Sequence, residues 1–201
     1  MDTADSYLGD NEKLLAEALH PYHPDVVIAT KGEQINLGPD WIPLGRPEYL
    51  RQQAELSLRR LRLDRIDPYQ LHRIDPTVPL AGQVGALRLL QDEGKVRHVG
   101  LSEVTVDQLI EAERITSIVS VQNRDNLADR ASGGVLDCCE RRGIAFIPWL
   151  LIAPTTRGPT SPTRSPGSPT GACHWLSPAF RFGVVTDFCG VSVQSGRCVL
   201  R

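Results

Sequence analysis

The sequence predicts an α/β fold, an incomplete TIM-type (β/α)8 barrel with parallel strands, followed by an irregular C-terminal tail. Short apolar runs alternate with amphipathic helical patterns from residue 10 to residue 149, which is typical of parallel βα units. The chain has 201 residues, whereas a complete barrel typically needs about 250. Beyond residue 153 the alternation stops. We therefore expect most, but not all, of a barrel.

The first elements follow in order from the N-terminus. Residues 1–3 are interpreted as the stub of a strand, and Asp10 is placed to cap a first helix. Asp25–Thr30 (DVVIAT) is expected to be a buried parallel strand, because it is β-branched and lacks polar alternation. A loop rich in Gly and Pro follows, and Pro47 then begins a long helix. The apolar face of that helix comprises Leu50, Ala54, Leu58 and Leu61.

The pattern continues to residue 149. Ile66–Leu71 is the next expected strand, although Pro68 within it would remove a ladder donor and distort the strand locally. A helix striped by Leu80, Val84, Leu87 and Leu90 follows, and Gly94 ends it. Thr105 and Gln108 can form a capping box. The other expected elements are strands Val96–Leu101, Ile118–Val121 and Ile144–Pro148, and a helix over residues 132–142 that ends at Gly143.

Two units are expected along the chain. Residues 1–153 form the partial barrel. Residues 154–201 form a tail that begins with PTTRGPTSPTRSPGSPTG. A stretch dominated by Pro, Thr, Ser and Gly cannot bury enough apolar surface to order itself, so we expect the tail to be disordered.

Composition excludes several classes of function. A formal net charge of −2 gives no general reason to expect nucleic acid or an acidic membrane as a partner. The chain has no signal peptide and no apolar run of the ~18–20 residues that a membrane span requires, so a cytoplasmic location is expected. The five Cys include no C-x-x-C pair and none has a His at zinc-finger spacing, so no metal is predicted. Cys138 and Cys139 fall in a helical pattern and are expected to be buried thiols.

Six motifs resemble the aldo-keto reductase family over residues 1–149. They are DTADSY, IATKG, IDPYQLH, VRHVGLSE, VSVQN and IAFIPW, and they occur in family order. The resemblance implies a (β/α)8 barrel that reduces a small carbonyl substrate, an aldehyde or ketone, with NADPH (or NADH). The family binds this cofactor without a G-x-G-x-x-G fingerprint, and the chain contains none.

The resemblance implies a catalytic tetrad of Asp2, Tyr7, Lys31 and His72. Each of these residues lies at or just beyond the C-terminal end of a short apolar segment, the edge at which catalytic groups gather in barrels. Tyr7 would donate its proton to the carbonyl oxygen. Lys31, salt-bridged to Asp2, would stabilise the phenolate, and His72 would hydrogen-bond and orient the carbonyl.

The resemblance also implies a nicotinamide site. Ser102, Gln122 and Asn123 match the positions that hold the carboxamide, which needs both donors and acceptors. Trp149 lies where an aromatic residue stacks on the nicotinamide ring. Glu103 stands where the family often has Asn, which removes a donor and adds charge.

Segments that would bind the cofactor's phosphates have no counterpart after Trp149. We therefore expect this chain to be a weak or inactive reductase. Two alternatives stay open, a non-catalytic regulatory or cofactor-binding relative, and a truncated or frame-shifted product without selected activity. The carbonyl substrate, the choice between NADP and NAD, and the oligomeric state are not set by the sequence.

Overall fold

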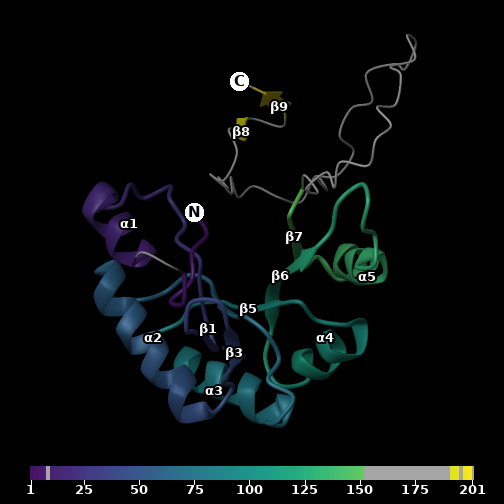
Figure 1. Cartoon of the computed structure of the whole chain (residues 1–201), viewed down its shortest axis with the longest axis horizontal. Helices are drawn as coiled ribbons and strands as arrows, with labels where there is room; N and C mark the ends of the chain where they lie inside the picture. The colour runs from purple at the N-terminus through teal and green to yellow at the C-terminus, as the bar shows by residue number, and fades with distance from the viewer. Residues whose placement is uncertain (8–9, 152–190, 195–196, 201) are drawn as a thin grey trace.

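The computed structural model describes residues 1–7, 10–151, 191–194 and 197–200. Its main sheet has five parallel strands in the order β1-β4-β5-β6-β7. Helices alternate with these strands along the chain and lie along their outer side (Figure 1). The predicted α/β fold with parallel βα units is confirmed. The strands are β1 (Thr30–Gly32), β4 (Tyr69–Leu71), β5 (Val99–Ser102), β6 (Ile118–Arg124) and β7 (Ala145–Trp149).

The core lies between the sheet and the helices that cover it. These helices are α1 (Asn11–Leu19), α2 (Pro47–Leu61), α3 (Leu80–Asp92), α4 (Val106–Glu113) and α5 (Gly133–Arg142). The expected apolar stripes of α2 and α3 face the strands, and Leu50, Leu61, Leu87 and Leu90 are buried. Cys138 and Cys139 are buried free thiols in α5, as predicted.

Sequence signals at helix ends hold at three places. Pro47 begins α2. Thr105 and Gln108 form both hydrogen bonds of the capping box at α4. Gly143 ends α5 in the left-handed conformation, with a φ of 68°, which glycine adopts without steric cost.

The predicted cap at Asp10 is wrong. Asp10 precedes α1, but its side chain makes no capping hydrogen bond and its backbone is left-handed, with a φ of 56°. The carboxylate instead pairs with Lys13, at 3.2 Å. The backbone carbonyl of Asp10 accepts from the amides of Lys13 and Leu14, so the helix begins there without a side-chain cap.

Pro68 does not interrupt a strand. The expected strand Ile66–Leu71 is shorter, because β4 begins at Tyr69, and Ile66 makes only an isolated bridge to Val96. Pro68 therefore stands just before β4, where a missing N–H is tolerated, and its carbonyl accepts from the amide of Thr30 at 3.2 Å. The expected strand Asp25–Thr30 is also displaced, since β1 starts only at Thr30.

Two hairpins were not predicted. The Gly- and Pro-rich loop after β1 contains β2 (Gln34–Asn36) paired antiparallel with β3 (Trp41–Pro43). β8 (Val191–Gln194) pairs with β9 (Arg197–Leu200) in the predicted disordered tail. The rest of that tail, including the Pro-rich stretch from residue 154, lies outside the described residues.

The predicted strand stub at residues 1–3 is present as a parallel bridge between Asp2 and Ala29. Backbone bonds from Thr3 N to Ala29 O (2.9 Å) and from Ala29 N to Met1 O (2.8 Å) hold it. The stub thereby places Asp2 beside the residues that enter β1. Within the described part of the chain, no helix is both long and apolar enough to cross a membrane.

Candidate active site

The predicted site residues gather at the C-terminal edge of the sheet. Lys31 lies in β1, His72 directly follows β4, and Ser102 ends β5. Gln122 and Asn123 lie near the end of β6, and Trp149 ends β7. Because parallel strands point the same way, their ends meet at one edge. Asp2 and Tyr7 reach that edge from the N-terminal stub and the turn that follows it.

Lys31 is the centre of the site, and its side chain is 1% exposed. Its Nζ donates to Asp2 Oδ2 at 2.7 Å, to the carbonyl of Thr3 at 2.9 Å and to the Tyr7 hydroxyl at 3.3 Å. These three acceptors use the three N–H donors of an ammonium. Lys31 is therefore held as a buried cation directly beside the phenol, with Asp2 as its counter-ion.

Three aromatic rings form a cluster on the Tyr7 side of this cation. The ring of Tyr7 lies edge-on to His72, with centroids 5.8 Å apart. Trp41 of the β2–β3 hairpin packs edge-on against both rings. Its ring centroid lies 6.0 Å from that of His72 and 6.4 Å from that of Tyr7. Sequence reasoning missed Trp41, because it stands in a segment that was expected to be an irregular loop.

His72 is neutral over the physiological pH range. Burial lowers its pKa to about 3, and the positive charges of Lys31 and Arg73 act in the same direction. A neutral imidazole carries one N–H donor and one acceptor nitrogen. Its Nδ1 is buried and has no hydrogen-bond partner among the described residues. His72 can therefore serve as a hydrogen-bond donor or acceptor to a bound group, but not as a proton source.

The predicted nicotinamide residues lie next to the tetrad. Gln122 Nε2 donates to Asp2 Oδ2 at 3.2 Å, which joins the end of β6 to the Asp2–Lys31 pair. Ser102 Oγ accepts from Arg73 at 3.2 Å, and the Trp149 indole donates to Glu103. Ser102, Gln122 and Trp149 thus stand on the adjacent strands β5, β6 and β7, and Gln122 is joined directly to the Asp2–Lys31 pair.

Asn123 is the predicted residue whose polar groups bind within the protein. Its Oδ1 accepts from Val104 N at 3.1 Å, and its Nδ2 donates to Val104 O at 2.8 Å and to Ser132 Oγ at 3.4 Å. These bonds fix the loop that follows β5. A contact between Asn123 and a cofactor stays a prediction.

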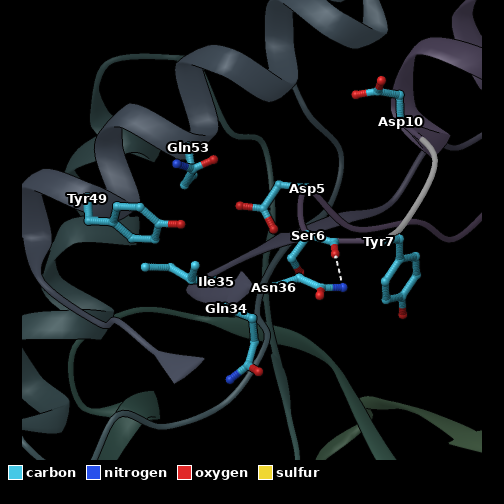
Figure 2. Close-up of a pocket in the computed structure, with 9 residues that line it drawn as sticks. All are labelled: Asp5, Ser6, Tyr7, Asp10, Gln34, Ile35, Asn36, Tyr49 and Gln53. Carbon is cyan, nitrogen blue, oxygen red and sulfur yellow. Dashed lines mark hydrogen bonds between the residues drawn. The ribbon is translucent and has the colours of Figure 1, made fainter. Parts of the chain in front are cut away.

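A pocket with a volume of about 350 Å³ shares Tyr7 with the site (Figure 2). Figure 2 shows the Asp5 carboxylate on the side of α2, toward Tyr49 and Gln53, and the Tyr7 ring directed away from it. Burial raises the pKa of Asp5 to about 7, and the nearby charge of Glu12 adds to the rise. The lining residues are Asp5, Ser6, Tyr7, Asp10, Gln34, Ile35, Asn36, Tyr49 and Gln53.

Glu33 is a second carboxyl group with a displaced pKa. It is fully buried directly after β1, with a φ of 114°, and Gln34 Nε2 donates to its Oε2 at 3.0 Å. Its Oε1 has no partner among the described residues. Burial raises the pKa of Glu33 to about 7, because an ionised carboxylate is poorly solvated there.

Glu33→Gln should stabilise the protein at pH 8. The folded form holds a proton on Glu33 up to about pH 7, whereas the unfolded chain releases it near its ordinary pKa. The folded protein therefore loses stability as the pH rises from the ordinary pKa of a glutamate to about 7, and above pH 7 the full cost of burying the carboxylate remains. Urea unfolding should show the variant about 1–3 kcal/mol more stable at pH 8, with little difference near pH 4.5.

Exposed Glu140→Gln on α5 is the matched control, and it should change the free energy of unfolding neither at pH 8 nor at pH 4.5. His72 acts in the opposite direction, since its lowered pKa costs stability as pH falls below its ordinary value. Comparing each variant with wild type at the same pH cancels that contribution. A Glu33→Gln protein that is less stable than wild type at pH 8 would show that the carboxylate is satisfied there.

Comparisons with known proteins agree with this geometry. Residues 1–167 match the Aldo/keto reductase family. The chain is 52% identical over 155 residues to an uncharacterized oxidoreductase of Schizosaccharomyces pombe. This match covers 76% of this chain and 50% of that protein. It is 36% identical over 161 residues to pyridoxine 4-dehydrogenase of Escherichia coli, covering 76% of this chain and 56% of that protein.

Solved structures give the same result. A glycerol dehydrogenase from Gluconobacter oxydans superposes with a TM-score of 0.67 at 28% identity, over 72% of this chain and 46% of that one. An aldo/keto reductase from Klebsiella pneumoniae, solved with NADP and acetate, superposes with a TM-score of 0.62 at 25% identity. The match covers 74% of this chain and 51% of that one. The chain therefore spans about half the length of these relatives.

Proposed function

The chain belongs to the aldo/keto reductase family, and from this premise we propose that it carries the machinery for NAD(P)H-dependent reduction of an aldehyde or ketone. The observation that carries the proposal is the buried Lys31 ammonium, which touches Asp2 and the Tyr7 hydroxyl together. A phenol held against a buried ammonium that is itself paired with a carboxylate is the arrangement that proton donation from Tyr7 requires.

Each member of the tetrad has a distinct task in this proposal. Tyr7 gives its hydroxyl proton to the carbonyl oxygen of the substrate, as a general acid. The Lys31 ammonium stabilises the phenolate that remains, and its salt bridge to Asp2 holds it in place. The neutral His72 donates a hydrogen bond to the same carbonyl oxygen and orients it.

The residues around the tetrad fit a nicotinamide. A bound NADPH or NADH would supply the hydride. The Ser102 hydroxyl and the Gln122 carboxamide offer the donors and acceptors that a carboxamide requires, and Trp149 offers a flat aromatic face. Solved relatives are complexes with NADP or NADPH, which favours the phosphorylated cofactor. Asn123, predicted for the same group, acts here by fixing the loop after β5.

The substrate is a small molecule with a carbonyl group. The relatives are named for different substrates, pyridoxine in one case and glycerol in another, so the family alone does not assign one to this chain. The pocket that Tyr7 shares with Asp5, Gln34 and Asn36 does not assign the substrate either, because the Tyr7 ring is directed away from the Asp5 side of that pocket (Figure 2).

Residues 1–201 assayed alone should bind NADPH more weakly than about 1 mM and show no measurable turnover. In this proposal the described residues would hold the nicotinamide end, and the charge-assisted bonds to the cofactor's phosphates would have to come from elsewhere. Titration of NADPH followed by tryptophan fluorescence is the direct test. Saturable binding at about micromolar concentrations would show that residues 154–201 complete the site, and the proposal of weak binding would then be abandoned.

A further inference from the structure

Two charged residues outside the tetrad converge on Trp149. The Trp149 indole N–H donates to Glu103 Oε1, and the guanidinium carbon of Arg73 lies 5.8 Å from the centre of the Trp149 ring. A carboxylate at the N–H edge and a cation over the face are the two charges that an indole attracts at those places. The Trp149 ring is therefore held by an anion and a cation at once.

Arg73 also links Trp149 to Ser102. Its Nη1 donates to the carbonyl of His72 at 2.8 Å and to Ser102 Oγ at 3.2 Å. When Ser102 Oγ accepts this bond, its own hydroxyl proton is free to point elsewhere. Within the described ranges the contacts of the Arg73 guanidinium are the indole ring and these two oxygens, and no salt bridge to a carboxylate is among them.

Glu103 is itself tightly held. Its backbone is left-handed, with a φ of 54°, a conformation that a non-glycine residue adopts only when its surroundings enforce it. Its amide donates to the carbonyl of Gln122 at 3.0 Å, and its carboxylate accepts from the amide of Arg124 at 2.5 Å. The loop after β5 is thus fastened to β6, which fixes the carboxylate that receives the indole.

We propose that Arg73 and Glu103 are positioning residues that fix Trp149 and Ser102 for contact with a nicotinamide. The inference rests on the proposed function, because Trp149 and Ser102 matter in this way only if the site takes that ring. The inference also explains what the negative charge of Glu103 does at this position. The residue supplies the acceptor that sets the plane of the indole, where a neutral asparagine would place a weaker one.

The contact is tested first without any ligand. In protein labelled with 15N at tryptophan, the Trp149 indole N–H signal is identified by its loss in Trp149→Phe. Glu103→Ala should move this signal upfield and speed its exchange with solvent, and Glu103→Gln, whose amide oxygen can still accept, should restore most of the effect. Exposed Glu111→Ala on α4 is the matched control. An unchanged Trp149 signal in Glu103→Ala would overturn the inference.

Reduced nicotinamide mononucleotide is the ligand probe, because it carries the ring without the adenosine half. Its dissociation constant, followed on the same indole signal, should rise by about tenfold or more in Glu103→Ala and Arg73→Met. Glu103→Gln and Arg73→Lys should recover part of the lost affinity for the mononucleotide. The surface variant Arg97→Met should bind it as tightly as wild type.

The outcomes separate the two claims. Wild-type affinity in both Glu103→Ala and Arg73→Met would overturn the positioning role while leaving the proposed function intact. Tighter binding in Arg73→Met would also overturn it, because Arg73 would then be competing for the ring's place. Failure of the wild-type chain to bind the mononucleotide would overturn the proposed nicotinamide site, and the positioning role with it.

Discussion

Replacing Tyr7 by Phe should remove nearly all carbonyl reduction while nicotinamide binding persists. The substitution deletes one hydroxyl oxygen, the atom that lies 3.3 Å from Lys31 Nζ, and keeps the ring that packs against His72. His72 cannot take over as the proton source, because its lowered pKa leaves it neutral. Loss of a positioned general acid typically costs about 10²–10⁴-fold in rate.

The measurement needs a background with turnover. A chimera in which the matching 76% of this chain replaces the aligned segment of the Escherichia coli pyridoxine 4-dehydrogenase provides one. Tyr7→Phe and the control Tyr22→Phe would be compared in it. Tyr22 bonds to the carbonyl of Leu61, away from the site, so its variant should keep full activity. Equal rates in the two variants would remove Tyr7 from the role of proton donor.

Lys31→Met should destabilise the fold by about 3 kcal/mol as well as abolish activity. The substitution keeps the length of the side chain but leaves Asp2, Thr3 O and the Tyr7 hydroxyl without their shared donor. A carboxylate that has lost its counter-ion in a buried place costs much more than the intact pair contributes. Urea unfolding at pH 7 measures the difference.

A double-mutant cycle isolates the ion pair. Asp2→Asn removes the charge of the partner, so Lys31→Met should cost clearly less in the Asp2→Asn background than in wild type. Additive losses would mean that the Asp2–Lys31 pair contributes nothing and that Lys31 stabilises the fold through its other contacts, with Thr3 O and the Tyr7 hydroxyl, and through its apolar stem. Lys13, which pairs with Asp10 at the exposed surface, supplies the control, and Lys13→Met should change stability by less than about 1 kcal/mol.

The parts of the fold that the sequence predicts are those governed by local chemistry. The apolar stripe of α2, the capping box at Thr105 and the glycine at position 143 each depend on neighbours a few residues away. Strand ends were less accurate, because β1 begins only where it meets β4 and β4 only where it meets β5. Pairing with a distant strand sets those limits, and no single segment contains that information.

The candidate site divides in the same way. The four tetrad residues were named from motifs, and the structure brings Asp2, Tyr7 and Lys31 into direct contact with His72 beside them. Their roles stay predictions. Trp41 and Arg73 were not named, because each acquires its place through tertiary contacts alone. Trp41 reaches His72 from the β2–β3 hairpin. Arg73, which follows β4, meets Trp149 at the end of β7, with β5 and β6 between those two strands.

The parallel bridge at Ala29 makes the register of three residues decisive for the chemistry. Side chains alternate between the two faces of a strand, so a slip of one residue would turn Asp2 away from Lys31 and bring Met1 or Thr3 to the ammonium. Neither of those side chains carries a charge that could balance it. The backbone hydrogen bonds of Met1 and Thr3 with Ala29 therefore determine which side chain of this segment faces the buried cation. A further bond, from the Met1 amine to the carbonyl of Val27 at 2.6 Å, holds the same register.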